Sequence, residues 1–119
     1  MTGSVEVLLR NTIRGLTFVS ETDAPFELVL LGPEPVSTAV LRGRFGLTDD
    51  VPVREISLSE MLGTQDRSES RLRSLRATIE KTFVAVHVFR LGDVEVRYVI
   101  AGAADGQWYG ITTTAIETG

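Results

Sequence analysis

Apolar residues recur along this chain with two different periods, and the changes of period predict where helices and strands lie. Near the start they return every three to four positions, which places six residues on one helix face: Val5, Leu8, Leu9, Thr12, Ile13 and Leu16. Ser4 is the predicted N-cap of this helix, and Gly15 is its predicted stop. A second stripe with the same spacing predicts the longest late helix, and its members are Leu72, Leu75 and Ile79. Asp66 and Glu69 form the predicted capping box of that helix.

Between these helices, short runs of β-branched and aromatic residues end at glycine, proline or polar clusters, which is typical of strands. Five runs predict five strands: Phe26–Leu31, Val51–Ile56, Phe83–Leu91, Val94–Gly102 and Gln107–Ile116. The first of them is predicted to be buried, and Ala103–Gly106 is the predicted turn before the last. Two short helices are also expected: Thr38–Phe45 after an N-cap at Ser37, and Leu58–Leu62 with Ser57 and Glu60 as a capping box.

Gly92 and Asp93 suit a two-residue hairpin loop of type II′ between the third and fourth predicted strands. Counting outward from this loop pairs Leu91 with Val94 and, further along, His87 with Tyr98. This register predicts a core histidine that is hydrogen-bonded to the tyrosine. Taken together, the elements predict an α+β fold in which helices cover a five-stranded, largely antiparallel sheet. At 119 residues, we expect a single domain over residues 1–119, which buries roughly 65% of its unfolded surface.

Composition narrows the possible functions. The chain contains no cysteine, so disulfides and thiolate metal sites are excluded. It shows no secretory leader and no apolar run long enough to span a bilayer, which predicts a soluble, cytoplasmic protein without membrane contact. Twelve basic against sixteen acidic residues give a net charge of −4, which argues against direct nucleic-acid binding. The same acidity either keeps the protein soluble or favours its approach to a basic, phosphate-binding cleft. On composition alone, solubility is the simpler interpretation.

Catalytic motifs are absent from the sequence. His87 is the only histidine, and no phosphate-binding glycine loop, zinc-protease motif or other metal-ligand cluster accompanies it. A hydrolase that uses His87 with Asp93 or Ser20 is a remote alternative. We therefore expect a protein that is not an enzyme and that needs no cofactor.

Three carboxylates near the start, those of Glu21, Asp23 and Glu27, have to be explained. A polar turn between the first helix and the first strand accounts for Asp23, because aspartate is common in turns. Glu27 is expected to face away from the core, where water solvates it. Neither explanation covers Glu21, which is a poor turn residue.

Three blocks of sequence together indicate a family. They are Ser20–Glu27, Arg90–Gly102 and Gly110–Thr118. In this order and at this spacing, the chain resembles the nuclease A inhibitor family from about Thr12 to Thr118. Members of that family are small acidic proteins that plug the active site of a sugar-non-specific, magnesium-dependent DNA/RNA endonuclease. The resemblance implies an α-β-α sandwich, in agreement with the predicted elements. We expect the protein to be a monomer when free.

The resemblance also implies a partner-binding site made of Glu21, Thr22, Asp23, Glu117 and Thr118. Glu21 matches the acidic residue after the loop serine, which stands in for a substrate phosphate in the nuclease site. Thr118 matches the family's terminal threonine, which approaches the magnesium shell. The protein would bind no metal of its own and would meet the Mg²⁺ of its partner, the endonuclease, across the interface.

The chain departs from the family pattern in two places. Gly119 follows Thr118, so the terminal carboxylate is displaced by one residue. The segment Gly63–Ser70 is shorter than the matching family loop and has no aromatic residue. Our expectation is a non-catalytic nuclease inhibitor that acts by acidic substrate mimicry. The alternative is a binding or regulatory module of the same fold that has no nuclease target.

Overall fold

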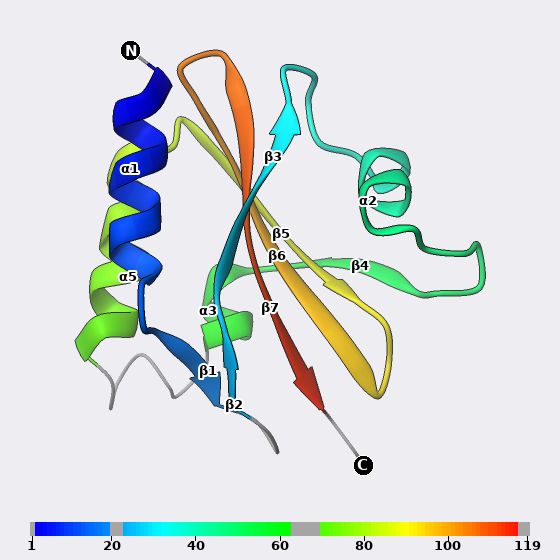
Figure 1. Cartoon of the computed structure of the whole chain (residues 1–119). Coiled ribbons are helices and arrows are strands. Elements are labelled where there is room, and N and C mark those ends of the chain that lie inside the picture. The colour runs from blue at the N-terminus through cyan, green and yellow to red at the C-terminus, as the bar shows by residue number, and fades with distance from the viewer. Residues whose placement is uncertain (1, 20–22, 63–69, 117–119) are drawn as a thin grey trace.

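The computed structural model describes residues 2–19, 23–62 and 70–116 (Figure 1). The elements follow the chain in the order α1 (Thr2–Ile13), β1 (Thr17–Val19), β2 (Asp23–Pro25), β3 (Glu27–Gly32), α2 (Thr38–Phe45), β4 (Val53–Ile56), α3 (Leu58–Leu62), α5 (Ser70–Thr82), β5 (Ala85–Leu91), β6 (Glu95–Ala104) and β7 (Gln107–Ile116). Strands β3, β7, β6, β5 and β4 form, in this order, a five-stranded sheet in which every neighbouring pair is antiparallel. The predicted α+β fold is confirmed.

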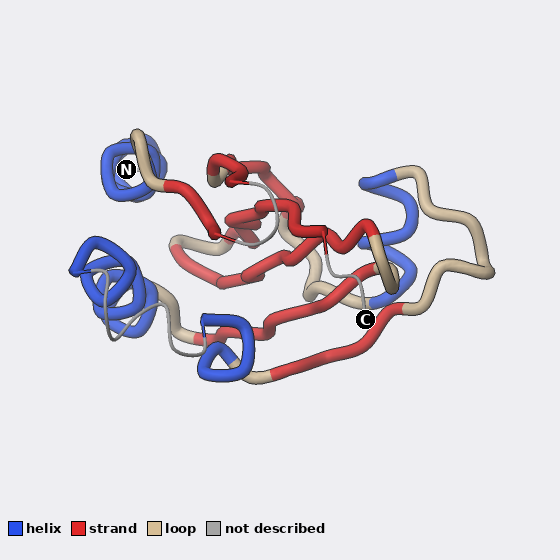
Figure 2. Tube along the Cα trace, turned by 90° about the horizontal axis from the view of Figure 1, so that it is seen from below, coloured by secondary structure: helices blue, strands red, loops and turns tan. Residues whose placement is uncertain are grey.

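Helices lie on both faces of this sheet (Figures 1 and 2). Helices α1 and α5 lie side by side on one face, together with α3, and α2 lies on the other. Each interface has its own apolar cluster. The larger cluster contains Leu9, Leu75 and Ile79 from the helices and Val88, Ile100 and Ile111 from the sheet. The smaller one packs Leu41 of α2 against Phe89, Val99 and Ala101. Among the described residues, no helix combines the length and the apolar character needed to cross a membrane.

The N-terminal caps predicted for α2 and α3 are confirmed. Ser37 caps α2, since its Oγ accepts a hydrogen bond from the amide of Val40 at 3.2 Å. The capping box of α3 is present, because the Glu60 amide donates to Ser57 Oγ (2.9 Å) and the Ser57 amide donates to Glu60 Oε1 (3.4 Å). The capping box predicted for α5 lies outside the described residues.

The prediction for α1 is partly wrong. The helix begins at Thr2, so Ser4 lies within it and is not its N-cap. Leu8 is 45% exposed, although its spacing placed it on the buried face with Leu9 and Ile13. The reason is that the face of α1 that packs on α5 and the sheet is narrower than the six predicted residues. Gly15 has a φ of 72°, which agrees with its predicted role as the stop.

The first predicted strand is an edge strand and is not fully buried, contrary to prediction. β3 pairs only with β7 in the described sheet, and Leu30 on it is 54% exposed. A single sequence does not distinguish a central apolar strand from an edge strand, because both present the same short apolar run.

The register predicted for the β5–β6 hairpin is wrong. Leu91 pairs with Arg97, not with Val94, and His87 lies opposite Ala101, not opposite Tyr98. The turn is longer than two residues because other groups hold it open. The amide of Gly92 donates to Pro52 O (2.9 Å), and the guanidinium of Arg90 donates to the carbonyl oxygens of Gly92 (2.8 Å) and Asp93 (3.2 Å). These contacts offset the preference of the Gly-Asp pair for a tight turn.

The turn before β7 is shorter than the predicted Ala103–Gly106, since β6 continues to Ala104. Gly102 lies in β6, as predicted, and the ring of Phe83 packs against it. A Cβ atom added at Gly102 would come within 2.1 Å of a ring carbon of Phe83. The absence of a side chain at Gly102 is thus required by packing.

We predict that Gly102→Ala lowers the free energy of unfolding by about 1–3 kcal/mol, because the new methyl group overpacks the core. Gly43→Ala is the matched control, since a Cβ atom at this α2 position meets nothing within 4 Å. It should raise the free energy of unfolding by about 0.5–1 kcal/mol, because glycine is a poor helix former. Urea unfolding of both variants measures these changes, and equal effects in the two would contradict the packing.

Candidate functional site

Most residues predicted to bind a partner, namely Glu21, Thr22, Glu117 and Thr118, lie outside the described residues. Asp23 opens β2, where its backbone pairs with that of Val19. The strands next to these residues are described: β1 and β2 flank residues 20–22, and β7 precedes residues 117–119.

The segment that carries Glu21 joins two paired strands. β1 and β2 are antiparallel, with Thr17 opposite Pro25 and Val19 opposite Asp23. The sequence predicted only a polar turn between a helix and a strand, so this small ladder was missed. Phe18 anchors it in the core, with an exposed fraction of 4%. The Phe18 ring meets the ring of Phe26 edge-on at 6.1 Å and lies 5.4 Å from that of Tyr98.

The segment that carries Thr118 continues from β7, a strand that is paired on both sides. β7 lies between β3 and β6, and its pairing with β6 extends to Ile116, which lies opposite Glu95. Ile111 is fully buried, and Thr112 Oγ1 donates to the carbonyl oxygen of Tyr98 at 2.9 Å. Ala115 is also buried, so the core holds the last strand to within one residue of its end at Ile116.

A buried side chain links the β1–β2 pair to β7. Thr113 is 2% exposed, and its Oγ1 donates a hydrogen bond to Pro25 O at 3.0 Å, with Ala24 O at 3.4 Å. These carbonyl groups belong to β2, and Thr113 lies three residues before the end of β7. The amide of Phe26 donates to Leu16 O at 3.4 Å and closes the other side of the ladder.

Thr113→Val removes this hydrogen bond while keeping the shape of the side chain. We predict that it lowers the free energy of unfolding by about 1–2 kcal/mol, because carbonyl groups at a buried site lose their donor. Thr114→Val is the control, since Thr114 is exposed on the same strand. Its free energy of unfolding in urea should equal that of the wild type. A loss of the same size in both variants would show that Thr113 contributes nothing special.

The described residues that flank residues 20–22, 63–69 and 117–119 lie in one part of the molecule, the lower part in Figure 1. β1 ends there and β2 begins there. α3 also ends in this part, α5 begins in it, and β7 reaches it at its last residue. This part faces the viewer in Figure 2. The fold thus brings together the anchors of every segment that the sequence linked to partner binding or to a departure from the family pattern.

His87 is exposed and not a core residue, which corrects the prediction. Its Nδ1 lies 2.9 Å from Glu55 Oε2, and its ring stacks on Trp108 with centroids 6.0 Å apart. Both members of the His–Glu pair are about half exposed, and such surface pairs contribute little to stability. Asp93, its proposed hydrolase partner, lies in the β5–β6 turn, and Ser20 lies outside the described residues. The described contacts of His87 thus differ from those that the hydrolase alternative needs.

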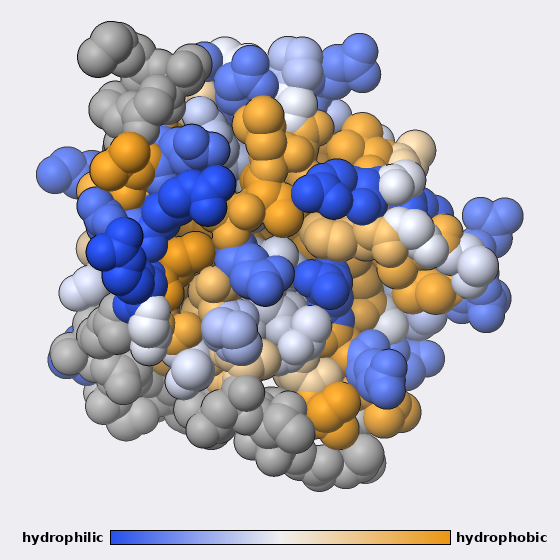
Figure 3. All heavy atoms as spheres, in the orientation of Figure 1, coloured by the Kyte–Doolittle hydropathy of each residue, from blue (hydrophilic) through white to orange (hydrophobic). Residues whose placement is uncertain are grey.

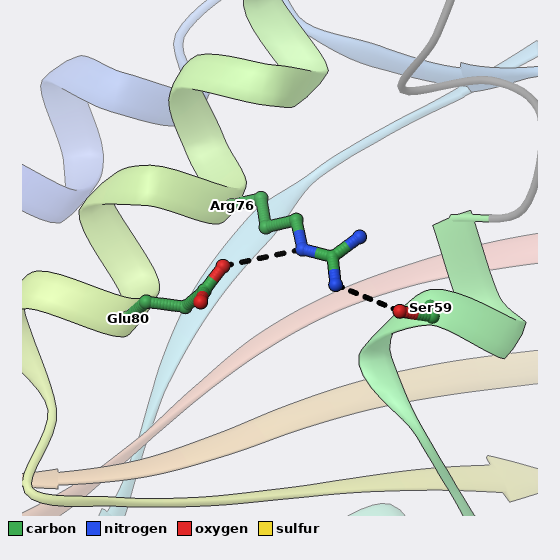
Figure 4. Close-up of polar contacts among 3 residues, drawn as sticks. All are labelled: Ser59, Arg76 and Glu80. Atoms are coloured by element: carbon green, nitrogen blue, oxygen red, sulfur yellow. Dashed lines mark hydrogen bonds and ion pairs between the residues drawn. The ribbon is translucent and has the colours of Figure 1, made fainter.

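A groove of about 730 Å³ runs between α3, α5 and the edge of the sheet. Its floor is apolar, with Ile56, Ile79 and Val88 among its residues. Arg76 crosses it, as Figure 4 shows, with its Nε 3.2 Å from Glu80 Oε1 and its Nη2 2.7 Å from Ser59 Oγ. These bonds tie α5 to α3, so the polar groups of the groove satisfy one another. No group of three or more metal-ligating side chains occurs in the described part of the chain.

Comparison with known proteins identifies the family of this chain. The chain matches the family model described as nuclease A inhibitor-like protein over residues 4–118. It therefore belongs to the nuclease A inhibitor-like family, as the three sequence blocks predicted. No curated protein matches the chain. The family suggests a non-enzymatic role and a partner of the nuclease kind.

Proposed function

We propose that this protein inhibits a sugar-non-specific, Mg²⁺-dependent DNA/RNA endonuclease by occupying its active site with acidic groups in place of substrate phosphates. Family membership over residues 4–118 supports the class of partner. The observation that carries the proposal is the hydrogen bonding of Thr113 on β7 to the carbonyl groups of β2. It joins the strand pair that flanks Glu21 to the strand that leads to Thr118. Two elements that must enter one cleft together need a common, rigid support.

Glu21 is the phosphate mimic in this proposal. A carboxylate that enters a basic cleft gains charge-assisted hydrogen bonds to metal-bound water and to cationic side chains. Only residues 20–22 separate the paired ends of β1 and β2. A connection this short loses little conformational entropy on binding, because its ends are already held in place. Thr22 and Asp23, which follow Glu21 in the chain, complete the contact.

Thr118 is the second element, and Glu117 accompanies it. The threonine hydroxyl reaches the water shell of the nuclease Mg²⁺, so the metal belongs to the partner. Net charge supports the same docking mode, since a protein of charge −4 is attracted to a surface that binds nucleic acid. Attraction of this kind raises the association rate and weakens with added salt.

The rival function is a binding module of the same fold without a nuclease target. Two features of the sequence favour it: Gly119 extends the chain past Thr118, and the segment Gly63–Ser70 has no aromatic residue. A nuclease surface that needs either contact would bind this chain poorly. Inhibition assays separate the two functions.

Titration of an Mg²⁺-dependent, sugar-non-specific endonuclease with this protein tests the proposal. We expect DNA cleavage to fall linearly and to stop near one equivalent, because one inhibitor fills one cleft. Added salt should slow association while the complex, once formed, persists. The nuclease made by the same organism is the decisive partner. Full activity of that nuclease at large excess of inhibitor would leave only the rival function.

A further inference from the structure

A second hollow, of about 480 Å³, lies at the end of β7. It is bounded by the segment after α2, by the β5–β6 turn and by the last residues of β7. Its lining is mixed. The apolar residues are Phe45, Leu47, Val51, Leu91, Val96, Ala115 and Ile116, and Glu95, Arg97 and Thr114 contribute polar surface. Figure 3 shows apolar side chains at the surface in this region, at the lower right of the molecule. We call this hollow the β7 pocket.

The charged groups of the β7 pocket do not select an ionic ligand. Arg97 lies over the ring of Phe45, with its Cζ 4.8 Å from the ring centroid, and its Nη1 donates to Thr112 Oγ1 at 3.1 Å. Glu95, the other charged residue of the lining, has the opposite sign. The two formal charges cancel within the lining, and most of the remaining lining residues are apolar. The pocket therefore fits an uncharged, apolar side chain.

The β7 pocket lies close to the position of Thr118 in the chain. Ile116 lines the pocket, and Thr118 is two residues further along the chain, so their Cα atoms are at most about 7 Å apart. A protein–protein interface of standard size covers about 800 Å² on each partner, which is a disc of about 16 Å radius. A nuclease interface of this size that is centred near Thr118 therefore also covers this pocket.

We infer that the β7 pocket receives a large aliphatic or aromatic side chain of the nuclease, from the rim of its active-site cleft. The inference rests on the proposed function, and it adds a contact that does not depend on acidic mimicry. Apolar pockets near the centre of an interface hold the side chains that contribute most to affinity. The anchor would hold the inhibitor in place while the acidic elements occupy the cleft.

Leu47→Ala tests this inference, because it shortens one wall of the pocket and adds no bulk. We expect the inhibition constant to rise about 30-fold, the effect of losing a strong interface contact. Val84→Ala is the matched control. Val84 is 88% exposed and precedes β5 at the opposite end of the molecule (Figure 1). Its inhibition constant should equal that of the wild type.

A second pair of variants keeps the test decisive if Leu47→Ala disturbs folding. Thr114 is exposed and lines the pocket, so Thr114→Trp should block it and weaken inhibition, whereas Thr114→Val should inhibit like the wild type. In the complex, the methyl groups of Leu47 should show nuclear Overhauser effects to nuclease protons.

The outcomes separate this inference from the proposed function. If the wild type inhibits, while Leu47→Ala and Thr114→Trp stay within twofold of it and no intermolecular effect appears, the pocket is not an anchor site and the proposed function stands. If the wild type does not inhibit the nuclease of the same organism, both are overturned.

Discussion

Glu21→Gln should raise the inhibition constant at least about 30-fold and leave the free energy of unfolding within about 0.5 kcal/mol of the wild type. The substitution keeps the size of the side chain and removes its charge. If Glu21 replaces a substrate phosphate, the neutral amide loses the charge-assisted hydrogen bonds that the cleft offers. Inhibition assays and urea unfolding measure the two quantities on the same preparation.

Glu34→Gln is the control for this prediction. Glu34 is exposed in the connection between β3 and α2, at the opposite end of the molecule from the strand ends that flank Glu21 (Figure 1). Either substitution changes the net charge from −4 to −3, so both alter long-range attraction equally. Only Glu21→Gln should lose affinity. Loss of stability with intact inhibition in Glu21→Gln would mean that this carboxylate is structural and that mimicry is wrong.

Ending the chain after Ile116 should abolish inhibition, and this is the second large effect that we expect. The pairing of β7 with β6 extends to Ile116, so the truncated protein keeps every sheet contact described above and should remain folded. It loses Thr118, whose hydroxyl is proposed to reach the metal shell. Thr118→Val isolates that hydroxyl and should weaken inhibition about 10-fold, the effect of one unpaired group at a desolvated site.

Variants at Gly119 refine this second prediction. Glycine accepts backbone angles that other residues avoid, so the wild-type chain can turn away from the cleft after Thr118. Deleting Gly119 should therefore be tolerated, or should tighten binding by placing the terminal carboxylate on Thr118. A bulky tag after Gly119 should impair inhibition. Intact inhibition by the tagged protein would move the interface away from the C-terminus and leave Glu21 as its centre.

Local signals predicted several elements with correct bounds. The helix Thr38–Phe45 and the strand Gln107–Ile116 were predicted with the ends that the structure shows. Both are bounded by residues whose preference is intrinsic: Ser37 caps the helix, Gly46 ends it with a φ of 64°, and Asp105 with Gly106 forms the turn before the strand. Such signals act within a few residues and survive whatever packs around them.

Contacts between distant parts of the chain account for what the sequence did not predict. The β5–β6 register depends on Pro52, which accepts a hydrogen bond from Gly92 across the loop before β4. The error in register also misplaced His87, which pairs with Glu55 on a different strand. No pattern within the hairpin itself contains this information.

In the candidate site, too, local sequence signals and long-range contacts differ in what they predict. Its acidic and C-terminal residues were found by resemblance to a family, and they remain predictions. The support beneath them was missed, although one signal was present. In the run Thr112–Thr114, strand alternation places the middle threonine on one face by itself. Its partners in β2 lie 88 and 89 residues away in the sequence, so only the folded chain identifies them.

Competition with nucleic acid tests the central proposal most directly. A fluorescently labelled DNA oligonucleotide is bound to a cleavage-inactive variant of the nuclease in Mg²⁺, and this protein is added while anisotropy is followed. We predict that anisotropy falls to the value of free DNA near one equivalent, because inhibitor and substrate need the same cleft. Glu21→Gln should shift this displacement to higher concentration. A ternary complex, seen as anisotropy that rises or stays constant while the inhibitor binds, would contradict active-site mimicry.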